Sequence, residues 1–483
     1  MEAKNLLFML SDQHRRDAAG SYGHPAVQTP HIDALAARGT RFTHAHTNCP
    51  ICVPARASLA TGRYVHQIGY WDNGIAYDGR VPSWGHRLRE QGFQVDSIGK
   101  LHFRSVDYDH GFSEEIDPLH VVGGVGDVLG CIRDNPPLRN ARPGVEEAGP
   151  GESTYLQYDV RNADQGCSWL ERHRDDERPW ALFLSFVCPH PPYICPPEYF
   201  DLYAVDDIPL PPLWRREQWN EHAHLDYVRR FLNFTEPFDE VTIRKMNAAY
   251  YGACTFLDRQ IGRVLEALRE NGLEEDTRII YTSDHGENLG TRGMFGKITL
   301  YEESSAIPLI LAGPDVPQGA AVNTPVSLVD CFPTVVEAVG AELGAEDGDL
   351  PGESLWGMAR QEDRERTVFG EYHAVASRHA SYMLCDRRYK YVYHVGEKCQ
   401  LFDLREDPLE QNDLADDPAC RATIEAFEKE LRALLDPDAV DARARADQRQ
   451  RVQEAGGEEA VRRRGAFQNS PVPGEKPAFR QFD

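Results

Sequence analysis

The sequence lacks an excess of basic residues. Its 483 residues include 52 lysines and arginines against 77 aspartates and glutamates, so the formal net charge is −25 at pH 7. Nucleic acids and anionic membranes attract proteins mainly through positive charge. We therefore expect neither a nucleic acid nor a membrane among the partners of this chain. If the substrate is an anion, a local positive pocket must overcome the negative charge of the whole protein.

Long apolar runs are also missing. The apolar stretch near the N-terminus, from Leu6 to Leu10, is shorter than the core of a signal peptide and much shorter than a membrane span. The eleven cysteines are scattered, and the Cys-x-x-Cys formed by Cys49 and Cys52 has no second pair with which to build a zinc site. The resulting expectation is a soluble, cytoplasmic protein with reduced thiols.

Apolar residues make up 41% of the chain, which is enough for a large core. Buried strands alternate with amphipathic helices, and this alternation predicts an α/β fold: a large, mostly parallel sheet between layers of helices, within residues 1–360. Two segments, 115–155 and 196–240, are expected to be irregular, the first as an insertion over the site. The strands are predicted at residues 5–10, 41–47, 93–98, 179–187, 278–282 and 307–312, and helices at residues 29–39, 82–91, 246–271 and 329–339.

The pattern changes after residue 360. Short strands joined by short turns predict a small antiparallel sheet, which a helix follows, and together they form a C-terminal α+β subdomain over residues 361–435. The remaining residues, 436–483, are charged and then proline-rich, as in a solvated tail or in an oligomerisation arm that docks on a neighbouring subunit. The four strands are predicted at residues 367–372, 381–385, 389–394 and 400–404, and the helix at residues 417–435.

Polar residues follow the predicted strands of the large sheet where each strand ends. Taken singly, each could be a helix cap, a surface charge or a core hydrogen bond. Because open α/β sheets place their sites at the carboxyl ends of the strands, we expect these residues to meet at one edge. Lys100 and His102 would point the same way if the chain is extended there. The residues are Asp12 and Gln13, Lys100 and His102, His190, and Asp284 and His285, with Lys297 nearby.

Cys52 begins a predicted helix that ends at Gly62. Pro54 is tolerated in a first turn, where its missing N–H costs nothing. The free N–H groups and the dipole of a helix N-terminus favour negative charge, and Arg56 adds a positive charge one turn further on the same face. This arrangement suits an anion whose reacting centre lies over Cys52. A lone cysteine is more often a small buried hydrophobe, so its surroundings must decide its role.

The stretch Cys52-Val53-Pro54-Ala55-Arg56, followed by Thr61-Gly62, resembles the formylglycine signature of the sulfatase family. Further motifs over most of the chain are similar to the sulfatase branch of the alkaline-phosphatase superfamily. The resemblance implies a sulfuric ester hydrolase with an alkaline-phosphatase-like fold. The motifs are Asp12 after the first strand, Gly99-Lys100-Leu101-His102, Pro189-His190-Pro191-Pro192, Ser283-Asp284-His285-Gly286-Glu287 with Lys297, and Leu401-Phe402-Asp403-Leu404.

Two departures from the commoner sulfatase pattern narrow the resemblance. Many sulfatases have a second aspartate where Gln13 stands and an asparagine where His285 stands. With Gln13, His285 and the Asn73 of its Asp-Asn-Gly turn, the sequence resembles the subgroup that contains choline sulfatases and phosphonate monoester hydrolases. The pair Lys100 and His102 resembles the pattern of the sulfatases in that subgroup. The order of elements and the long tail resemble those of choline sulfatases.

The resemblance implies a modified residue and a metal. Cys52 would be oxidised by a formylglycine-generating enzyme, a transient partner, to an aldehyde whose hydrate is the nucleophile. Asp12, Gln13, Asp284 and His285 would hold one divalent cation. Two carboxylates, an amide and an imidazole suit Ca²⁺ or Mn²⁺, and the imidazole favours Mn²⁺.

The resemblance also implies roles toward a small-molecule sulfate ester. His102 would take a proton from the second hydroxyl at residue 52, so that sulfate leaves and the aldehyde returns. In the step before it, Lys100 and Lys297 would neutralise the sulfuryl oxygens, Arg56 and Asn73 would hold the hydrate and the anion, and His190, with Lys297, would protonate the leaving alcohol.

Two other functions stay open. A phosphonate monoester or phosphodiester hydrolase would use the same machinery, because a tetrahedral anionic site differs little between sulfur and phosphorus. A non-catalytic, metal-stabilised binding protein could share the fold, since a fold does not fix a function. Whichever function applies, we expect the protein to form a homo-oligomer, a dimer or a tetramer.

Overall fold

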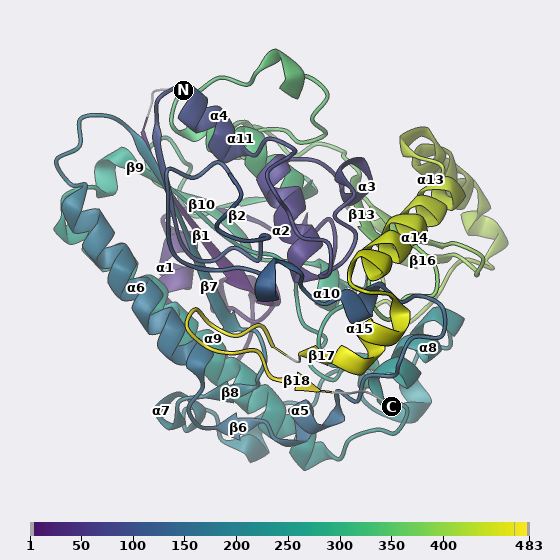
Figure 1. The fold of residues 1–483 in the computed structure, drawn as a ribbon. Coiled ribbons are helices and arrows are strands. Elements are labelled where there is room, and N and C mark those ends of the chain that lie inside the picture. Colours follow the sequence, from purple (N-terminus) through teal and green to yellow (C-terminus); the bar gives the residue numbers. More distant parts are fainter. Residues whose placement is uncertain (1–3, 468, 481–483) are drawn as a thin grey trace.

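A computed structural model describes residues 4–467 and 469–480 of the chain. An eight-stranded sheet forms the centre of its larger part (Figure 1). Among the described strands of this sheet, β10 runs antiparallel to both of its neighbours, and the other pairs are parallel. In spatial order the strands are β11 (Ala320–Val322), β2 (Gly39–Phe42), β10 (Leu309–Ala312), β9 (Thr277–Ser283), β1 (Asn5–Asp12), β7 (Trp180–Pro189), β4 (Gln94–Lys100) and β5 (Glu114–Leu119).

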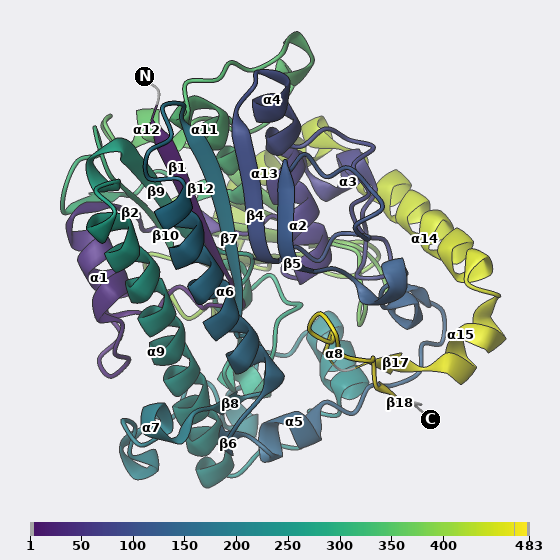
Figure 2. The same ribbon diagram turned by 60° about the vertical axis from the view of Figure 1, so that its left-hand side comes forward.

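Helices cover both faces of this sheet. Side chains alternate along β1, so Phe8 and Leu10 belong to one apolar cluster while Leu7 and Met9 belong to another. No helix within the described ranges combines the length and the apolar content needed to cross a bilayer. One face carries α1 (Pro30–Ala37), α6 (Thr154–Arg172) and α9 (Glu240–Glu270), and the other carries α2 (Cys52–Thr61), α4 (Trp84–Glu90) and α11 (Cys331–Ala338) (Figure 2).

Several segments differ from the sequence prediction. The segment 115–155, predicted to be irregular, contains most of β5 and the short helix α5 (Arg142–Glu146), and the loop-rich segment 196–240 contains α8 (Ala223–Leu232). The sequence pattern did not predict α6 either. This helix buries polar as well as apolar residues, because Asp159 accepts hydrogen bonds from the backbone N–H groups of the neighbouring strand β7. Because the buried positions of α6 are both polar and apolar, its amphipathic pattern is hard to recognise in the sequence.

The single strand predicted at 41–47 is two strands. The chain turns after β2, and β3 (Ala45–His46) pairs with β12 (Val326–Ser327) in a separate two-stranded sheet. The C-terminal part contains the predicted four-stranded antiparallel sheet, so the predicted fold class is confirmed, whereas the domain boundaries at residues 360 and 435 stay predictions. Its elements in order are β13 (Val368–Tyr372), β14 (Ser381–Cys385), β15 (Tyr389–His394), β16 (Gln400–Asp403) and the helix α13 (Arg421–Leu434).

The C-terminal residues fold back onto their own chain, as the yellow ribbon in Figure 1 shows. Asp447 accepts a hydrogen bond from Trp71 Nε1 at 2.8 Å, and Arg451 donates to the carbonyl of Gly74 at 2.7 Å. The described part of this tail is therefore packed and is not a solvated tail; Gln468 and residues 481–483 lie outside the described residues. The oligomerisation arm and the homo-oligomer stay predictions. The elements of the tail are α14 (Pro437–Glu454), α15 (Glu458–Arg464), β17 (Ala466–Phe467) and β18 (Phe479–Arg480).

Candidate active site

Four neighbouring strands, β9, β1, β7 and β4, bring most of the predicted site residues to one edge of the sheet. Asp12 ends β1 and Lys100 ends β4, while His190 follows β7 and Asp284 follows β9. These strands are parallel, so their carboxyl ends lie side by side. The strand order thus assembles groups that are far apart in the sequence.

Cys52 lies at the centre of this edge. It is the first residue of α2, which ends at Gly62 in a left-handed conformation with a φ of 65°. Its Sγ lies 3.5 Å from Asp12 Oδ1 and 3.2 Å from His285 Nε2. The side chain is 1% exposed, so residue 52 meets these groups in a dry environment at a helix N-terminus.

The surroundings of Cys52 fit a divalent cation. Asp12, Asp284 and His285 are fully buried, and together with Cys52 they place one ligand atom each within 4.8 Å of one another. His285 Nδ1 donates to the carbonyl of Gly286 at 3.1 Å, which leaves Nε2 as the nitrogen with a free lone pair. That Nε2 lies 3.8 Å from Asp12 Oδ1 and 3.6 Å from Asp284 Oδ1. Oxygen and imidazole donors of this kind suit Ca²⁺ or Mn²⁺.

Gln13 is held in a strained conformation beside this set. Its φ is 67°, a left-handed value that costs a non-glycine residue about 1 kcal/mol or more. Its backbone N–H donates to Asp284 Oδ1 at 3.1 Å, and its carbonyl accepts from the hydroxyl of Tyr250 at 2.6 Å. Its side-chain Oε1 accepts from Lys297 Nζ at 2.5 Å. The amide oxygen of Gln13 thus faces Lys297 at the edge of the cavity.

Glu287 holds the other end of that amide. It accepts from Gln13 Nε2 and from the hydroxyl of Tyr193 at 2.9 Å, and from the backbone N–H groups of Leu289 at 3.1 Å and Gly296 at 2.5 Å. The sequence reasoning included Glu287 in a motif but assigned it no role. The signal in the sequence is that Glu287 follows Asp284 and His285 in the same motif, which indicates a place beside the predicted metal site.

Arg56 uses all its nitrogens on groups of the protein. Nε donates to Asp284 Oδ2 at 2.8 Å, and Nη2 donates to Asp12 Oδ2 at 3.1 Å. Nη1 donates to the carbonyl of Lys100 at 2.5 Å and to Ser185 Oγ at 2.9 Å. Lys100 Nζ lies 2.7 Å from Asp12 Oδ2. Sequence reasoning did not select Ser185, which sits inside an apolar strand with no adjacent motif.

The pKa values of the two buried aspartates shift in opposite directions. Burial acts to raise the pKa of Asp12, but the charges of Lys100 and Arg56 outweigh it, so the pKa lies well below its usual range. At Asp284, burial and then the negative charge of Asp12 raise the pKa to about 6. Asp12 is therefore the more acidic of the pair.

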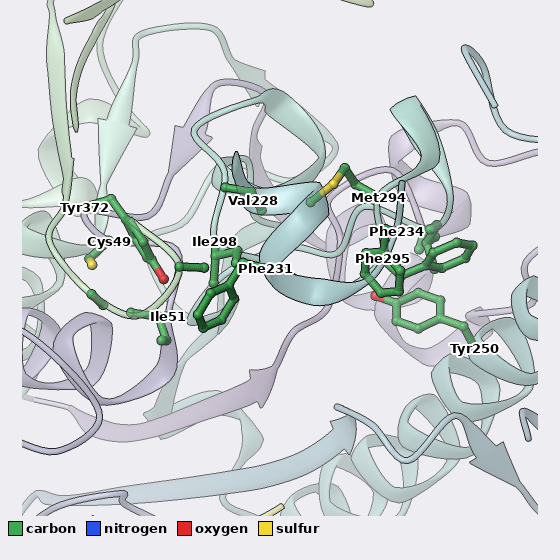
Figure 3. Close-up of a cluster of buried hydrophobic side chains, with 14 of the residues drawn as sticks. Cys49, Ile51, Val228, Phe231, Phe234, Tyr250, Met294, Phe295, Ile298 and Tyr372 are labelled. Atoms are coloured by element: carbon green, nitrogen blue, oxygen red, sulfur yellow. The ribbon is translucent and has the colours of Figure 1, made fainter. Parts of the chain in front are cut away.

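A cavity of about 450 Å³ opens onto Cys52, a size typical of small-molecule sites. Apolar residues that line it include Ile51, Phe231 and Ile298, whose side chains lie close together in Figure 3. His190 Nδ1–H donates to the carbonyl of Pro191 at 2.7 Å, so Nε2 of the neutral imidazole carries no proton. The predicted site residues that line the cavity are Gln13, Cys52, Asn73, His102, His190 and Lys297.

The expectation of an extended chain from Lys100 to His102 is wrong. His102 has a φ of 57°, and the N–H groups of Leu101 and His102 both donate to the carbonyl of Leu119, at 3.1 and 2.8 Å. The chain therefore turns away from the direction of β4. Lys100 lies fully buried against Asp12, whereas His102 lines the cavity.

Comparisons with known proteins show the family of this chain. A family model described as "Sulfatase" matches residues 4–341, and one described as "N-sulphoglucosamine sulphohydrolase, C-terminal" matches residues 290–436. The chain belongs to the sulfatase family. The prediction of a sulfuric ester hydrolase of the alkaline-phosphatase superfamily is thereby confirmed.

Individual relatives cover nearly the whole sulfatase chain. The "Choline-sulfatase" of Rhizobium meliloti (strain 1021) is 31% identical over 473 residues, which span 92% of this chain and 90% of that protein. "Arylsulfatase K" of Bos taurus is 30% identical over 443 residues, spanning 86% of this chain and 78% of that protein. The crystal structure of the phosphonate monoester hydrolase of Agrobacterium radiobacter superposes with a TM-score of 0.72 at 25% identity, covering 89% and 95% of the two chains.

Replacing Asp284 by Asn tests the metal site without any substrate. The variant loses one of the two carboxylates that face His285, so we expect the affinity of metal-stripped protein for Ca²⁺ or Mn²⁺ to fall at least about tenfold. Isothermal titration calorimetry measures it. The matched control is Asp96→Asn, a buried aspartate of β4 that accepts from Trp169 Nε1 at 2.9 Å, away from the site. Equal affinities of the Asp284 variant and the wild type would rule out this ligand set.

Proposed function

We propose that this sulfatase hydrolyses small-molecule sulfate monoesters with a formylglycine at residue 52 and one divalent cation. The position of Cys52 carries the proposal. Its Sγ lies between Asp12 and His285 and faces a cavity that Lys297 also lines. An ordinary cysteine nucleophile would not need a cation-binding set in contact with its sulfur. An oxygen atom in place of that sulfur would be a natural ligand for the cation.

The aldehyde would be made by a formylglycine-generating enzyme and would be hydrated in the site. A cation held by Asp12, Gln13, Asp284 and His285 would lower the pKa of a hydroxyl at residue 52. The protein itself would keep that hydroxyl dry and oriented at the N-terminus of α2. The oxygen of this hydroxyl would attack the sulfur of the ester. The sulfuryl group would move to that oxygen, and the alcohol would leave.

The cations of the site would bind the sulfuryl oxygens. Lys100 and Lys297 supply ammonium groups, and Arg56 acts by holding Asp12 and Asp284 in place. Asn73 Oδ1 accepts from the backbone N–H of Val53 at 3.2 Å, and the residue lines the cavity, so its amide N–H groups would donate to the anion. A negatively charged protein would in this way offer a positive site to an anionic ester.

His190 would protonate the leaving alcohol from Nε2. Burial and then the charges of Lys297 and Lys100 lower the pKa of His190 well below its usual range, so the imidazole is neutral before substrate binds. The negative charge of a bound sulfate ester would offset these cations and allow His190 to carry a proton. Lys297, which lines the same cavity, would supply that proton. In the second stage His102 would accept the proton of the remaining hydroxyl at residue 52, so that sulfate leaves and the aldehyde returns.

A second candidate is a phosphonate monoester or phosphodiester hydrolase with the same machinery. The likeness to the phosphonate monoester hydrolase of Agrobacterium radiobacter favours it. The two candidates differ in the reacting atom and share the residues, so they predict the same effects of mutations in the site.

Mass spectrometry of the peptide that contains residue 52 tests the proposal. We expect this residue to be about 18 Da lighter than cysteine, the difference between –CH₂SH and –CHO. Cys52→Ala should abolish turnover, whereas Cys331→Ala, at an equally buried cysteine of α11, should retain it. An unmodified Cys52 in an active preparation would reject the formylglycine mechanism.

Replacing His190 by Asn tests its role as the acid. Protonation matters most when the leaving alcohol is a poor leaving group, so we expect kcat/KM to fall by about 100-fold for an alkyl sulfate and by less than about tenfold for 4-nitrophenyl sulfate. The control is His173→Asn, since His173 also bonds a backbone carbonyl through Nδ1 but lies at the end of α6. Equal losses for both esters would contradict the assignment.

A further inference from the structure

The C-terminal segment places one side chain inside the active site. Ser470 Oγ lies 2.9 Å from His102 Nε2, although 368 residues separate the two in the sequence. Ser470 is 8% exposed, and it lines the same cavity as Cys52. The contact is therefore buried and adjacent to the reacting groups.

Ser470 is held from behind. The hydroxyl of Tyr155, in α6, donates to the carbonyl of Ser470 at 2.6 Å. Two residues further on, Val472 is buried in an apolar cluster with Tyr155 and Leu119. Figure 2 shows this yellow segment turned inward from α15. A hydrogen bond and an apolar anchor thus fix the position of the serine hydroxyl.

The contact of Ser470 is made to one of the two ring nitrogens of His102, Nε2. Nδ1 of His102 is buried and has no hydrogen-bond partner among the described residues. A neutral imidazole carries its proton on one nitrogen and accepts at the other. If Nε2–H donates to Ser470 Oγ, Nδ1 is left as the basic nitrogen.

We propose that Ser470 is a positioning residue of the active site, which holds His102 in the orientation and the tautomer that make Nδ1 the base of the second stage. The inference rests on the proposed function. In that stage the O–H proton of the remaining hydroxyl at residue 52 moves to Nδ1, its oxygen forms the C=O bond, and the C–O bond to sulfate breaks with its electron pair leaving on sulfate. Water then rehydrates the aldehyde, and His102 returns its proton to solvent.

Pre-steady-state kinetics of Ser470→Ala test this role. Alcohol release precedes the second stage, so we expect the variant to show a burst of about one equivalent of phenol per active site from an aryl sulfate, followed by a kcat about tenfold below that of the wild type. Ser470→Thr keeps the hydroxyl and should restore most of kcat. Tyr155→Phe, which loosens Ser470, should lower kcat in the same direction.

Tyr158→Phe is the matched control. Its hydroxyl donates to the carbonyl of Asp117 at 2.6 Å from the same helix, and Tyr158 is buried in the same cluster as Tyr155. It should keep the kcat of the wild type and show no burst. Wild-type kinetics in Ser470→Ala would overturn the proposal, and so would equal losses in Ser470→Ala, Ser470→Thr and Tyr158→Phe.

The ¹⁵N chemical shifts of His102 give a second readout that needs no turnover. We expect the Nε2–H tautomer in the wild type and a mixture of tautomers in Ser470→Ala. Unchanged shifts in the variant would overturn the positioning role even if no sulfate ester is hydrolysed. A wild type that is inactive on every ester but shows the expected shifts would instead count against the proposed function.

Discussion

Two buried carboxylates, Asp12 and Asp284, repel each other at the carboxyl edge of the sheet, and the rest of the site depends on how this repulsion is balanced. Arg56 donates to both, and Lys100 lies 2.7 Å from Asp12. Both cations are almost fully buried, so removing either would leave an unpaired charge in the interior, which typically costs several kcal/mol. A divalent cation bound by the carboxylates would complete the balance, and residue 52 would then lie beside the strongest positive charge of the site.

The same arrangement explains how an acidic protein can bind an anion. The net charge of −25 acts over the whole surface, where salt screens it. Lys297 lines a partly closed cavity, where screening is weak. Lys100 and Arg56 lie buried next to it, against Asp12 and Asp284. Ile51, Phe231 and Ile298, which lie close together in Figure 3, line the same cavity, so its lining combines charged and apolar groups.

The sequence predicted those parts of the site that depend on local pattern and strand order. Asp12 and Asp284 stand directly after apolar runs, and strand ends in an α/β sheet converge whatever the intervening loops do. Long-range contacts had no such signal. Ser470 contacts His102 because the C-terminal tail, whose sequence is typical of a solvated segment, folds back onto the chain. The sequence pattern did not predict α6, because this helix buries the polar Asp159 against β7. Burial of polar groups with tertiary partners is invisible to a pattern that equates polar with exposed.

The central claim is that this site is matched to transfer of a sulfuryl group. Family membership and the geometry around residue 52 agree with it. The alternative function is hydrolysis of phosphonate monoesters or phosphodiesters, which the likeness to a phosphonate monoester hydrolase supports. The most direct measurement compares kcat/KM of metal-replete protein for an aryl sulfate, a phosphodiester and a phosphonate monoester that share one leaving phenol. The account predicts the highest value for the sulfate, with lesser activity toward the phosphorus esters. A phosphonate monoester or phosphodiester turned over faster than the sulfate would contradict it.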